Sequence, residues 1–366
     1  MRFVSPLLKH AVYPALHRTG WLNRIPPVGG YAVVNYHGLL PADLSHDSSD
    51  IEKFLDGPLV DSLTFRKHLQ FLKAHYRVIH PEDFRVSIEE QKPLSPRSVL
   101  VTCDDGLINN LTDMLPILQG EDVPCLFFVT TASCRDNPGM LWYHELYYLM
   151  RNRPLENLDL RPPLEDGPLP LSSQNLQSEW WSTLRRASQL DAEARASWMA
   201  LVRTQCGPPP APSQQRWRLL NAPELQQLSA AGMTIGAHTR THPILSLCSD
   251  EEARREIQES KIEIERALGR PVWAFAYPFG NPDTMGQREF RLAEEAGFSC
   301  AFLNVESWRE LRFDSRREPR RENGAAERPG PFALPRTHVT SDMTLPEYAA
   351  HLSGLHTRLQ RAVGAC

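Results

Sequence analysis

Short runs of apolar, β-branched and aromatic residues recur along the chain and alternate with longer amphipathic segments. These runs have the length and composition of buried strands. They cover Ala32–Tyr36, Arg77–Ile79, Ser98–Thr102, Cys125–Val129, Thr234–Ala237, Val272–Ala276 and Ser299–Leu303. Strands that alternate with helices are typical of an α/β protein in which the strands form a layer or a barrel. The pattern therefore predicts an α/β fold.

The amphipathic segments between these runs predict helices. Ser249 and Glu252 have the spacing of a capping box, and Gly269 provides a stop signal. Helices are expected over residues 63–76, 110–119, 250–268 and 287–296. Each of them follows or precedes a predicted strand, as the α/β alternation requires.

Two stretches interrupt this alternation. Residues 130–221 contain many prolines around a helical middle at 180–202, which predicts an insertion over one end of the domain. Residues 306–328 contain seven Arg and six acidic residues, which predicts a solvated or disordered loop. We expect an N-terminal segment over 1–30, the main domain over 31–345 with the insertion, and a C-terminal helix over 346–366.

Composition narrows the class of protein. With 366 residues and 41% hydrophobic content, the chain can bury a large core, and a net charge of −4 gives no overall attraction to nucleic acid. No run approaches the roughly 20 apolar residues of a spanning helix. The seven Cys include no Cys-x-x-Cys pair, and the N-terminus has no continuous apolar stretch, so we expect a cytoplasmic protein. The N-terminal segment either caps the domain or contacts a membrane peripherally.

Carboxylates and imidazoles follow the predicted strands. Asp104 and Asp105 come after one strand, and His238 and His242 come after another. Taken alone, two adjacent aspartates more often belong to a turn, and a His-x-x-x-His pair more often consists of ordinary surface or core histidines. In a parallel α/β fold, however, the strand ends converge at one face. Two imidazoles and one carboxylate bind a divalent ion with open positions, and a second carboxylate can take a proton from water. The sequence thus indicates a metal-dependent hydrolase.

These motifs resemble those of the polysaccharide deacetylase family, carbohydrate esterase family 4, with its NodB-homology domain. Residues 102–106 (Thr-Cys-Asp-Asp-Gly) are similar to the family's Thr-Phe-Asp-Asp-Gly, and residues 238–242 (His-Thr-Arg-Thr-His) to its His-Ser/Thr-x-x-His. Residues 36–37 and 275–280 resemble further blocks. Residues 334–336 (Leu-Pro-Arg) resemble a block of the branch associated with surface-polysaccharide genes. The resemblance covers about residues 31–340.

The resemblance implies a distorted (β/α)7 barrel and a set of site residues. By that resemblance Asp105, His238 and His242 would bind the metal, expected to be Zn²⁺, with Co²⁺, Ni²⁺ or Mn²⁺ as alternatives. Asp104 would be the catalytic base, and the backbone N–H of Phe279 would contact the oxyanion. The implied reaction removes an N-acetyl group from a sugar and releases acetate.

Zn²⁺ is thus the ion expected in this site, because two imidazoles and a carboxylate are ligands that it commonly takes in hydrolases. Three positions depart from the family pattern. Ala276 stands where many members have an Arg that pairs with the base, and we expect Arg336 to contact Asp104 instead. His338 is the candidate for the general acid, with a surface histidine as the alternative. Cys103 replaces a Phe and is expected to be a small buried side chain.

Around the same site, His37 and Tyr277 are candidates for contacts with the substrate. The aromatic residues of the insertion could stack on sugar rings, although helical spacing more often indicates core packing. The expected substrate is an N-acetylated sugar, an oligosaccharide or a lipid-linked glycan, and a cytoplasmic location favours a precursor over finished polymer. Two other functions stay open: hydrolysis of a non-sugar C–N bond such as a cyclic amide, and non-catalytic carbohydrate binding.

Overall fold

A parallel sheet forms the centre of the protein. The computed structural model describes residues 8–27, 29–40, 58–133, 139–151, 157–158, 169–170, 176–306 and 330–364. The sheet has the strand order β10-β1-β3-β4-β7-β8-β9. In addition, β2 pairs with the first two residues of β3. Its strands are β1 (Tyr31–Tyr36), β2 (Arg77–Val78), β3 (Ser98–Cys103), β4 (Leu126–Val129), β7 (Thr234–Ala237), β8 (Ala274–Ala276), β9 (Cys300–Phe302) and β10 (Thr337–His338).

The segment that ends in β10 joins the two edges of this sheet. Its Leu334 pairs with Phe302 of β9. A few residues later, Thr337 and His338 pair with Val34 and Asn35 of β1. The strands therefore close into a ring, which confirms the barrel expected from the sequence.

Alternate residues of each strand face the inside and the outside of the barrel. Val33, Leu100 and Phe128 belong to one apolar cluster. Their chain neighbours Val34 and Val101 belong to another, which packs against the surrounding helices. Gly236 leaves space inside, because a Cβ there would lie 2.6 Å from the Phe128 ring. The interior is thus filled by side chains, and polar groups occur toward the ends where the strands stop.

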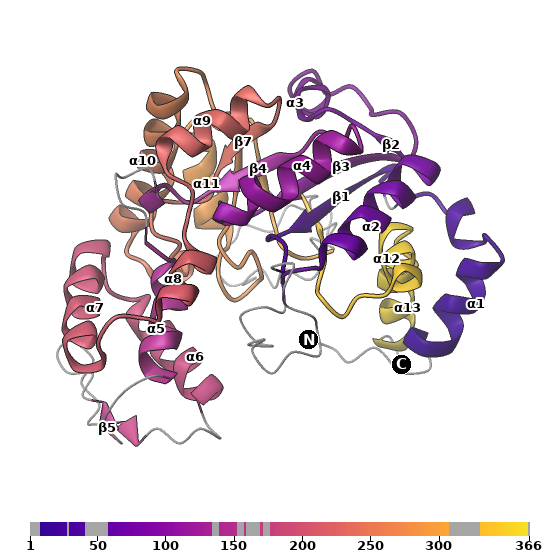
Figure 1. Ribbon diagram of the computed structural model, residues 1–366. Coiled ribbons are helices and arrows are strands. Elements are labelled where there is room, and N and C mark those ends of the chain that lie inside the picture. The colour runs from indigo at the N-terminus through magenta and orange to yellow at the C-terminus, as the bar shows by residue number, and fades with distance from the viewer. Residues whose placement is uncertain are drawn as a thin grey trace, which may run out of the picture.

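Helices surround the barrel (Figure 1). They are α2 (Ser62–His75), α3 (Pro81–Glu89), α4 (Leu115–Gly120), α9 (Ala222–Ala230), α10 (Asp250–Leu268), α11 (Gln287–Glu295), α12 (Leu345–Leu352) and α13 (Leu355–Gly364). The Ser249 side chain accepts a hydrogen bond from the Glu252 N–H, as the capping motif predicts. The Glu252 carboxylate instead accepts from the N–H of Ala192, so only half of the capping box forms.

Helices α5 (Trp142–Arg151), α6 (Leu176–Ala187), α7 (Ala192–Cys206) and α8 (Ala211–Trp217) lie within the expected insertion. Figure 1 shows them gathered on one side of the molecule. Helices α6 and α7 form the helical middle expected at 180–202, and the chain turns between them at 188–191. Tyr143, Trp180 and Trp217 are buried in an apolar cluster of their own, which favours the core interpretation of these rings. The domain boundaries stay a prediction.

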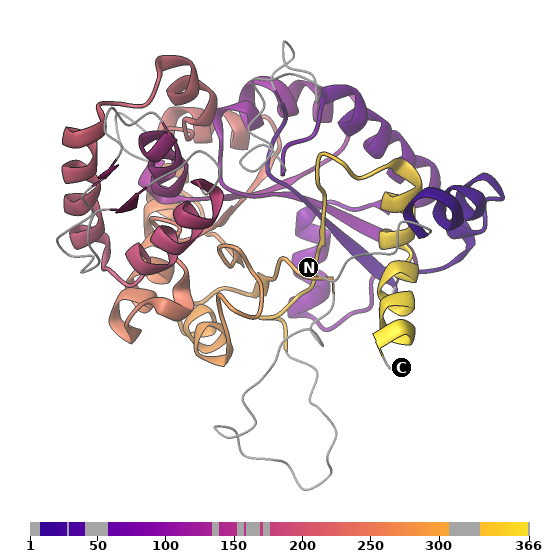
Figure 2. The same ribbon diagram turned by 90° about the horizontal axis from the view of Figure 1, so that it is seen from below.

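The N-terminal helix α1 (Tyr13–Arg18) lies beside the C-terminal helices on the opposite side of the barrel (Figures 1 and 2). The Tyr13 side chain is buried, and its hydroxyl is 2.9 Å from Nδ1 of His356. The C-terminal segment forms two helices, because the chain turns at Ser353 and Gly354. In the described ranges, no helix is long and apolar enough to cross a membrane. The cytoplasmic location stays a prediction, and the charged segment expected as a loop lies outside the described residues beyond Glu306.

Candidate active site

Four residues at the ends of the strands have left-handed backbone conformations although none is glycine. Their φ angles are 77° at Asp105, 63° at Thr239, 58° at His242 and 60° at Phe279. Such conformations cost on the order of 1 kcal/mol or more each and persist where surrounding structure enforces them. Their clustering at the mouth of the barrel marks this end as the candidate site.

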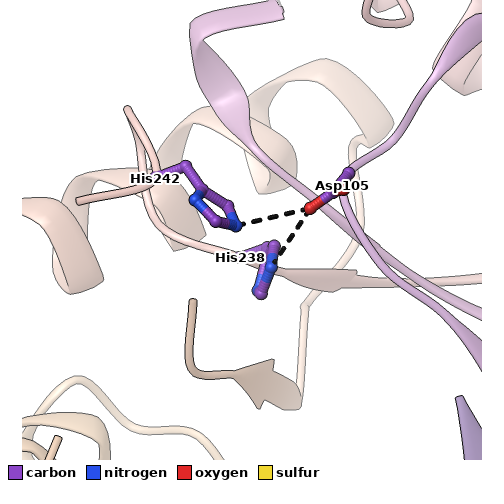
Figure 3. Close-up of side chains that lie close together, drawn as sticks. All are labelled: Asp105, His238 and His242. Atoms are coloured by element: carbon purple, nitrogen blue, oxygen red, sulfur yellow. Dashed lines mark ion pairs between the residues drawn. The ribbon is translucent and has the colours of Figure 1, made fainter. Parts of the chain in front are cut away.

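Asp105, His238 and His242 converge there (Figure 3). Oδ1 of Asp105 lies 3.5 Å from Nε2 of His238 and 3.4 Å from Nε2 of His242. The same Oδ1 atom is buried without a hydrogen-bond partner. Two atoms that ligate one tetrahedral zinc ion at about 2.1 Å lie about 3.4 Å apart. The orphaned oxygen and these spacings therefore fit a divalent ion.

The hydrogen bonds around the triad also suit metal binding. Nδ1 of His238 lies 2.8 Å from the carbonyl oxygen of Ala276, which fixes the ring so that Nε2 faces Asp105. Burial alone would raise the pKa of Asp105, but the interaction with the two facing imidazole rings outweighs it and lowers that pKa well below its ordinary value. The carboxylate is therefore ionised, as a ligand must be.

A second group of metal-binding side chain types lies near the C-terminus. Glu306, His351 and His356 come within 4.8 Å of one another. Here both carboxylate oxygens already have partners, since one contacts His351 and the other accepts from the hydroxyl of Thr357 at 2.9 Å. This group thus resembles a hydrogen-bonded structural cluster, unlike the triad with its orphaned oxygen.

The loop that carries the two histidines is fixed by α10. The Glu256 carboxylate is fully buried and accepts the backbone N–H groups of Arg240 and Thr241, both at 2.8 Å. The hydroxyl of Thr239 donates to the carbonyl of His238 and accepts the N–H of His242. These contacts explain how the left-handed residues of the loop are maintained.

Asp104 faces the inside of the barrel beside the triad. Its two oxygens accept Nη1 and Nη2 of Arg336 at 2.7 Å each, and Oδ2 also accepts Nδ2 of Asn35 at 2.8 Å. Burial would raise the pKa of Asp104, but the charge of Arg336 outweighs it and lowers that pKa. The contact expected for Arg336 is present, and its contribution to a reaction stays a prediction.

His338 and His37 line the mouth of the barrel, and both are partly exposed. Their ring centroids are 4.9 Å apart, and Nδ1 of His338 lies 2.9 Å from Nδ2 of Asn304. Burial, with the neighbouring His37 ring, lowers the pKa of His338 to about 3. His338 is thus a neutral ring in this environment.

Phe279 and Tyr277 differ in their positions. The partly exposed Phe279 ring packs 4.9 Å from the His242 ring and 6.0 Å from the Trp181 ring. Among the described residues, its backbone N–H has no hydrogen-bond acceptor, so the amide is available to a ligand. Tyr277 does not face the site: it is buried against Phe290 outside the barrel, because residues of a strand alternate. The expected substrate contact of Tyr277 is therefore wrong.

Cys103 is the small buried side chain that its position predicts. It belongs to the outer apolar cluster, and its sulfur lies 3.7 Å from that of Met114. Burial raises the pKa of this thiol well above its ordinary value, so it is not a reactive thiolate.

Three polar residues of the site were not anticipated from the sequence. Asn35 and Asn304 lie between Asp104 and His338, and Glu256 supports the histidine loop. For Asn35 and Asn304, the alternation along the strands offered a signal. Each follows an inward-facing apolar residue, Val33 or Phe302, by two positions and therefore also faces inward. Glu256 gave no signal, because its sequence neighbours are those of an ordinary charged helix.

A sequence model of the family described as polysaccharide deacetylase matches residues 210–301, which include both histidines. The resemblance to polysaccharide deacetylases is confirmed. No curated protein gives a significant sequence match to the chain. The polysaccharide deacetylase match does not include Asp104 and Asp105, whose assignment depends on the structure.

Solved structures of similar fold cover most of the chain. The Streptococcus pyogenes deacetylase PplD in complex with acetate has a TM-score of 0.52 and 14% identity, over 88% of this chain and 97% of that one. The de-N-acetylase from Aggregatibacter actinomycetemcomitans has a TM-score of 0.50 and 12% identity, over 88% and 99%. At these identities the similarity shows the fold.

Proposed function

We propose that the protein is a metal-dependent hydrolase that removes an N-acetyl group from a sugar. The observation that carries this proposal is the convergence of Asp105, His238 and His242 on one point beside a second, arginine-bound carboxylate. An ion at that point needs ligands that are deprotonated and oriented, and the triad offers both. Zn²⁺ is the ion that this ligand set favours.

Each remaining group has a distinct role in the proposed reaction. When bound, the ion lowers the pKa of a coordinated water and polarises the acetyl carbonyl. Asp104 accepts the proton of the attacking water, and the depressed pKa keeps this base ionised. The Phe279 N–H donates to the developing oxyanion. As the C–N bond breaks, Asp104 gives this proton to the leaving amine and acetate is released, while the Nε2–H group of the neutral His338 ring donates a hydrogen bond to the substrate.

The arginine contact also orients the base. A carboxylate bound by both guanidinium nitrogens cannot rotate, so the position of its free lone pairs is fixed relative to the triad. A pKa below the ordinary value weakens Asp104 as a base, and the lowered pKa of the bound water would offset this. Arg336, from the segment that leads into β10, thus takes the place of the arginine that many family members have at the position of Ala276.

The substrate is proposed as an N-acetylated sugar unit of an oligosaccharide or lipid-linked glycan, in surface-polysaccharide metabolism. This follows from the resemblance of the Leu-Pro-Arg block at 334–336 and from the confirmed family resemblance. Phe279 and Trp181, partly exposed beside the triad, are side chains on which a sugar ring could stack.

The test measures hydrolysis by zinc-loaded protein, as acetate released from N-acetyl sugars and as ring-opened product from cyclic amides. Substrates would be N-acetylated oligosaccharides, lipid-linked N-acetyl sugars and cyclic amides, each with and without a chelator. We expect acetate from at least one sugar substrate, loss of release with chelator, and recovery on adding zinc. Cleavage of cyclic amides alone would favour a non-sugar hydrolase, and sugar binding without acetate release would favour a non-catalytic relative. Release that chelator leaves unchanged would contradict the proposed metal dependence.

A further inference from the structure

Two side-chain amides connect Asp104 with His338 inside the barrel. Nδ2 of Asn35 donates to Oδ2 of Asp104 at 2.8 Å and to Oδ1 of Asn304 at 3.2 Å. Asn304 in turn lies beside the His338 ring. The four residues come from four different strand regions, β1, β3, β9 and β10, so the barrel itself creates the row.

Arg336 fixes the orientation of the first amide. A guanidinium only donates hydrogen bonds. Nη1 of Arg336 lies 3.0 Å from Oδ1 of Asn35, so this atom must be the oxygen, and the amide nitrogen must face Asp104 and Asn304. The reversed amide would place two donors against each other and two acceptors against each other.

The orientation of Asn35 sets that of Asn304. Because Asn35 presents a donor, the Asn304 atom that faces it must be Oδ1, and Nδ2 of Asn304 then faces the histidine. That nitrogen lies 2.9 Å from Nδ1 of His338, whereas Oδ1 lies 3.1 Å away. The Asn304 backbone is also fixed, since its N–H donates to the Gly280 carbonyl at 2.8 Å.

We propose that Asn35 and Asn304 are positioning residues that fix the tautomer of His338, with its Nδ1 as an acceptor and its proton on Nε2. A proton on Nδ1 would face the Asn304 amide donor at 2.9 Å. The Nε2–H group has no partner among the described residues and is the ring's only donor. This inference rests on the proposed function for its purpose, because a neutral ring with its N–H at Nε2 can donate a hydrogen bond to the bound substrate.

The row also links the proposed base with the ring that faces the substrate. One set of hydrogen bonds orients both the carboxylate that moves the water proton and the histidine that donates to the substrate. Asn304 is therefore expected to affect turnover rather than metal binding, since it contacts none of the three proposed ligands.

The test is the imidazole spectrum of zinc-loaded protein at pH 7.5, in which two-bond ¹H–¹⁵N couplings identify the protonated ring nitrogen. For wild type we expect His338 protonated at Nε2. In Asn304→Asp, a carboxylate faces Nδ1, so we expect a protonated Nδ1. Asn23→Asp is the matched control, because Nδ2 of Asn23 contacts Nε2 of His75 at 3.3 Å, and its His338 signals should not change.

A wild-type ring protonated at Nδ1 would overturn the proposal, as would an Asn304→Asp spectrum identical to wild type. If the variant does not fold, the wild-type spectrum still decides. The kinetic counterpart is a fall in kcat of about 10-fold or more in Asn304→Leu with unchanged zinc content. A correct tautomer in a protein without acetate release would leave the inference intact and refute the proposed function instead.

Discussion

Arg336 and Asp104 are two opposite charges buried inside an otherwise apolar barrel. The Arg336 side chain is fully buried and stacks near the rings of Phe128 and Phe302, at 5.3 and 5.9 Å. Its Nε donates to the Leu303 carbonyl, so each part of the guanidinium has a partner. Removal of either charge from such a pair leaves the other unpaired in a medium of low polarity.

We therefore predict that Arg336→Met lowers the free energy of unfolding by roughly 3–5 kcal/mol. Adding Asp104→Asn should recover part of the loss, because it removes the unpaired carboxylate. Arg218→Met is the control, as the Arg218–Glu224 pair has the same two-bond geometry at a partly exposed site and should cost about 1 kcal/mol or less. Urea denaturation measures all four proteins. Equal losses for Arg336 and Arg218 would refute the prediction.

At the residue scale, the sequence predicted the groups with distinctive chemistry. Asp104, Asp105, His238 and His242 stand in short motifs directly after strands, so local sequence was enough to find them. Arg336 was expected because Ala276 left the base without a partner. Asn35 and Asn304 were missed, since their role depends on which strands become neighbours when the barrel closes.

The histidine loop depends on a helix that lies after it in the chain. Glu256 on α10 is the acceptor for two backbone N–H groups and one hydroxyl of this loop. Replacing the carboxylate by an amide introduces a donor that faces these donors. The loop carries His242 with a left-handed backbone, so a weaker acceptor should allow this residue to relax.

Glu256→Gln should therefore weaken zinc affinity by about 10- to 100-fold, as is typical for residues that support metal ligands. A competition titration with a chromophoric chelator measures this affinity. Glu259→Gln is the matched control on the same helix, because Glu259 pairs with the Arg240 side chain at 3.0 Å but is 43% exposed. The zinc affinity of this variant should stay near that of the wild type. Similar affinities for the two variants would contradict the role of Glu256.

Helices α12 and α13 are joined to the barrel by a partly buried ionic contact. His351 contacts Glu306, which also accepts a hydrogen bond from Thr357. Burial would lower the pKa of His351, but the Glu306 charge outweighs it and raises that pKa. Burial would raise the pKa of Glu306, but the His351 charge outweighs it and lowers that pKa. Each charge thus stabilises the other.

This contact predicts a pH-dependent stability. Because the pKa of His351 is raised in the folded protein, its contribution to stability is complete below the ordinary value of 6.5. This contribution is lost as the pH rises through the pKa of the folded state. Because the pKa of Glu306 is lowered in the folded protein, its contribution to stability is complete above the ordinary value of 4.5. This contribution is lost as the pH falls through the pKa of the folded state. His351→Gln should then cost about 2 kcal/mol near pH 6 and less at pH 9. Urea denaturation at both pH values, with the exposed His10→Gln as control, tests this, and a loss that does not depend on pH would contradict it.

At the element scale, the sequence predicted the strands with long apolar runs. It missed β10, because only two residues pair there and the segment is positioned by β9 and β1 on either side. The break between α6 and α7 was also missed: Asp191 caps the start of α7 by accepting the Ala194 N–H, a signal that lies within an otherwise helical pattern.

The whole molecule combines a closed barrel with helices that support one side of its mouth. Trp142 of the insertion donates from Nε1 to the carbonyl of His242 at 3.3 Å, and Arg195 contacts the Thr241 hydroxyl. The segment that closes the barrel supplies Arg336 to the base. The site is therefore complete only when the late segment and the insertion are both in place, and this long-range dependence is what sequence patterns predict least well.

The central claim is that Asp105, His238 and His242 bind one divalent ion while the adjacent Asp104 does not. Zinc affinity and stoichiometry, measured by competition titration of wild type, Asp105→Asn and Asp104→Asn, test it most directly. We predict one ion per wild-type chain, affinity at least about 100-fold weaker in Asp105→Asn, and nearly unchanged affinity in Asp104→Asn. Equal loss in the two variants, or a wild-type chain that binds no zinc, would contradict this account of the site.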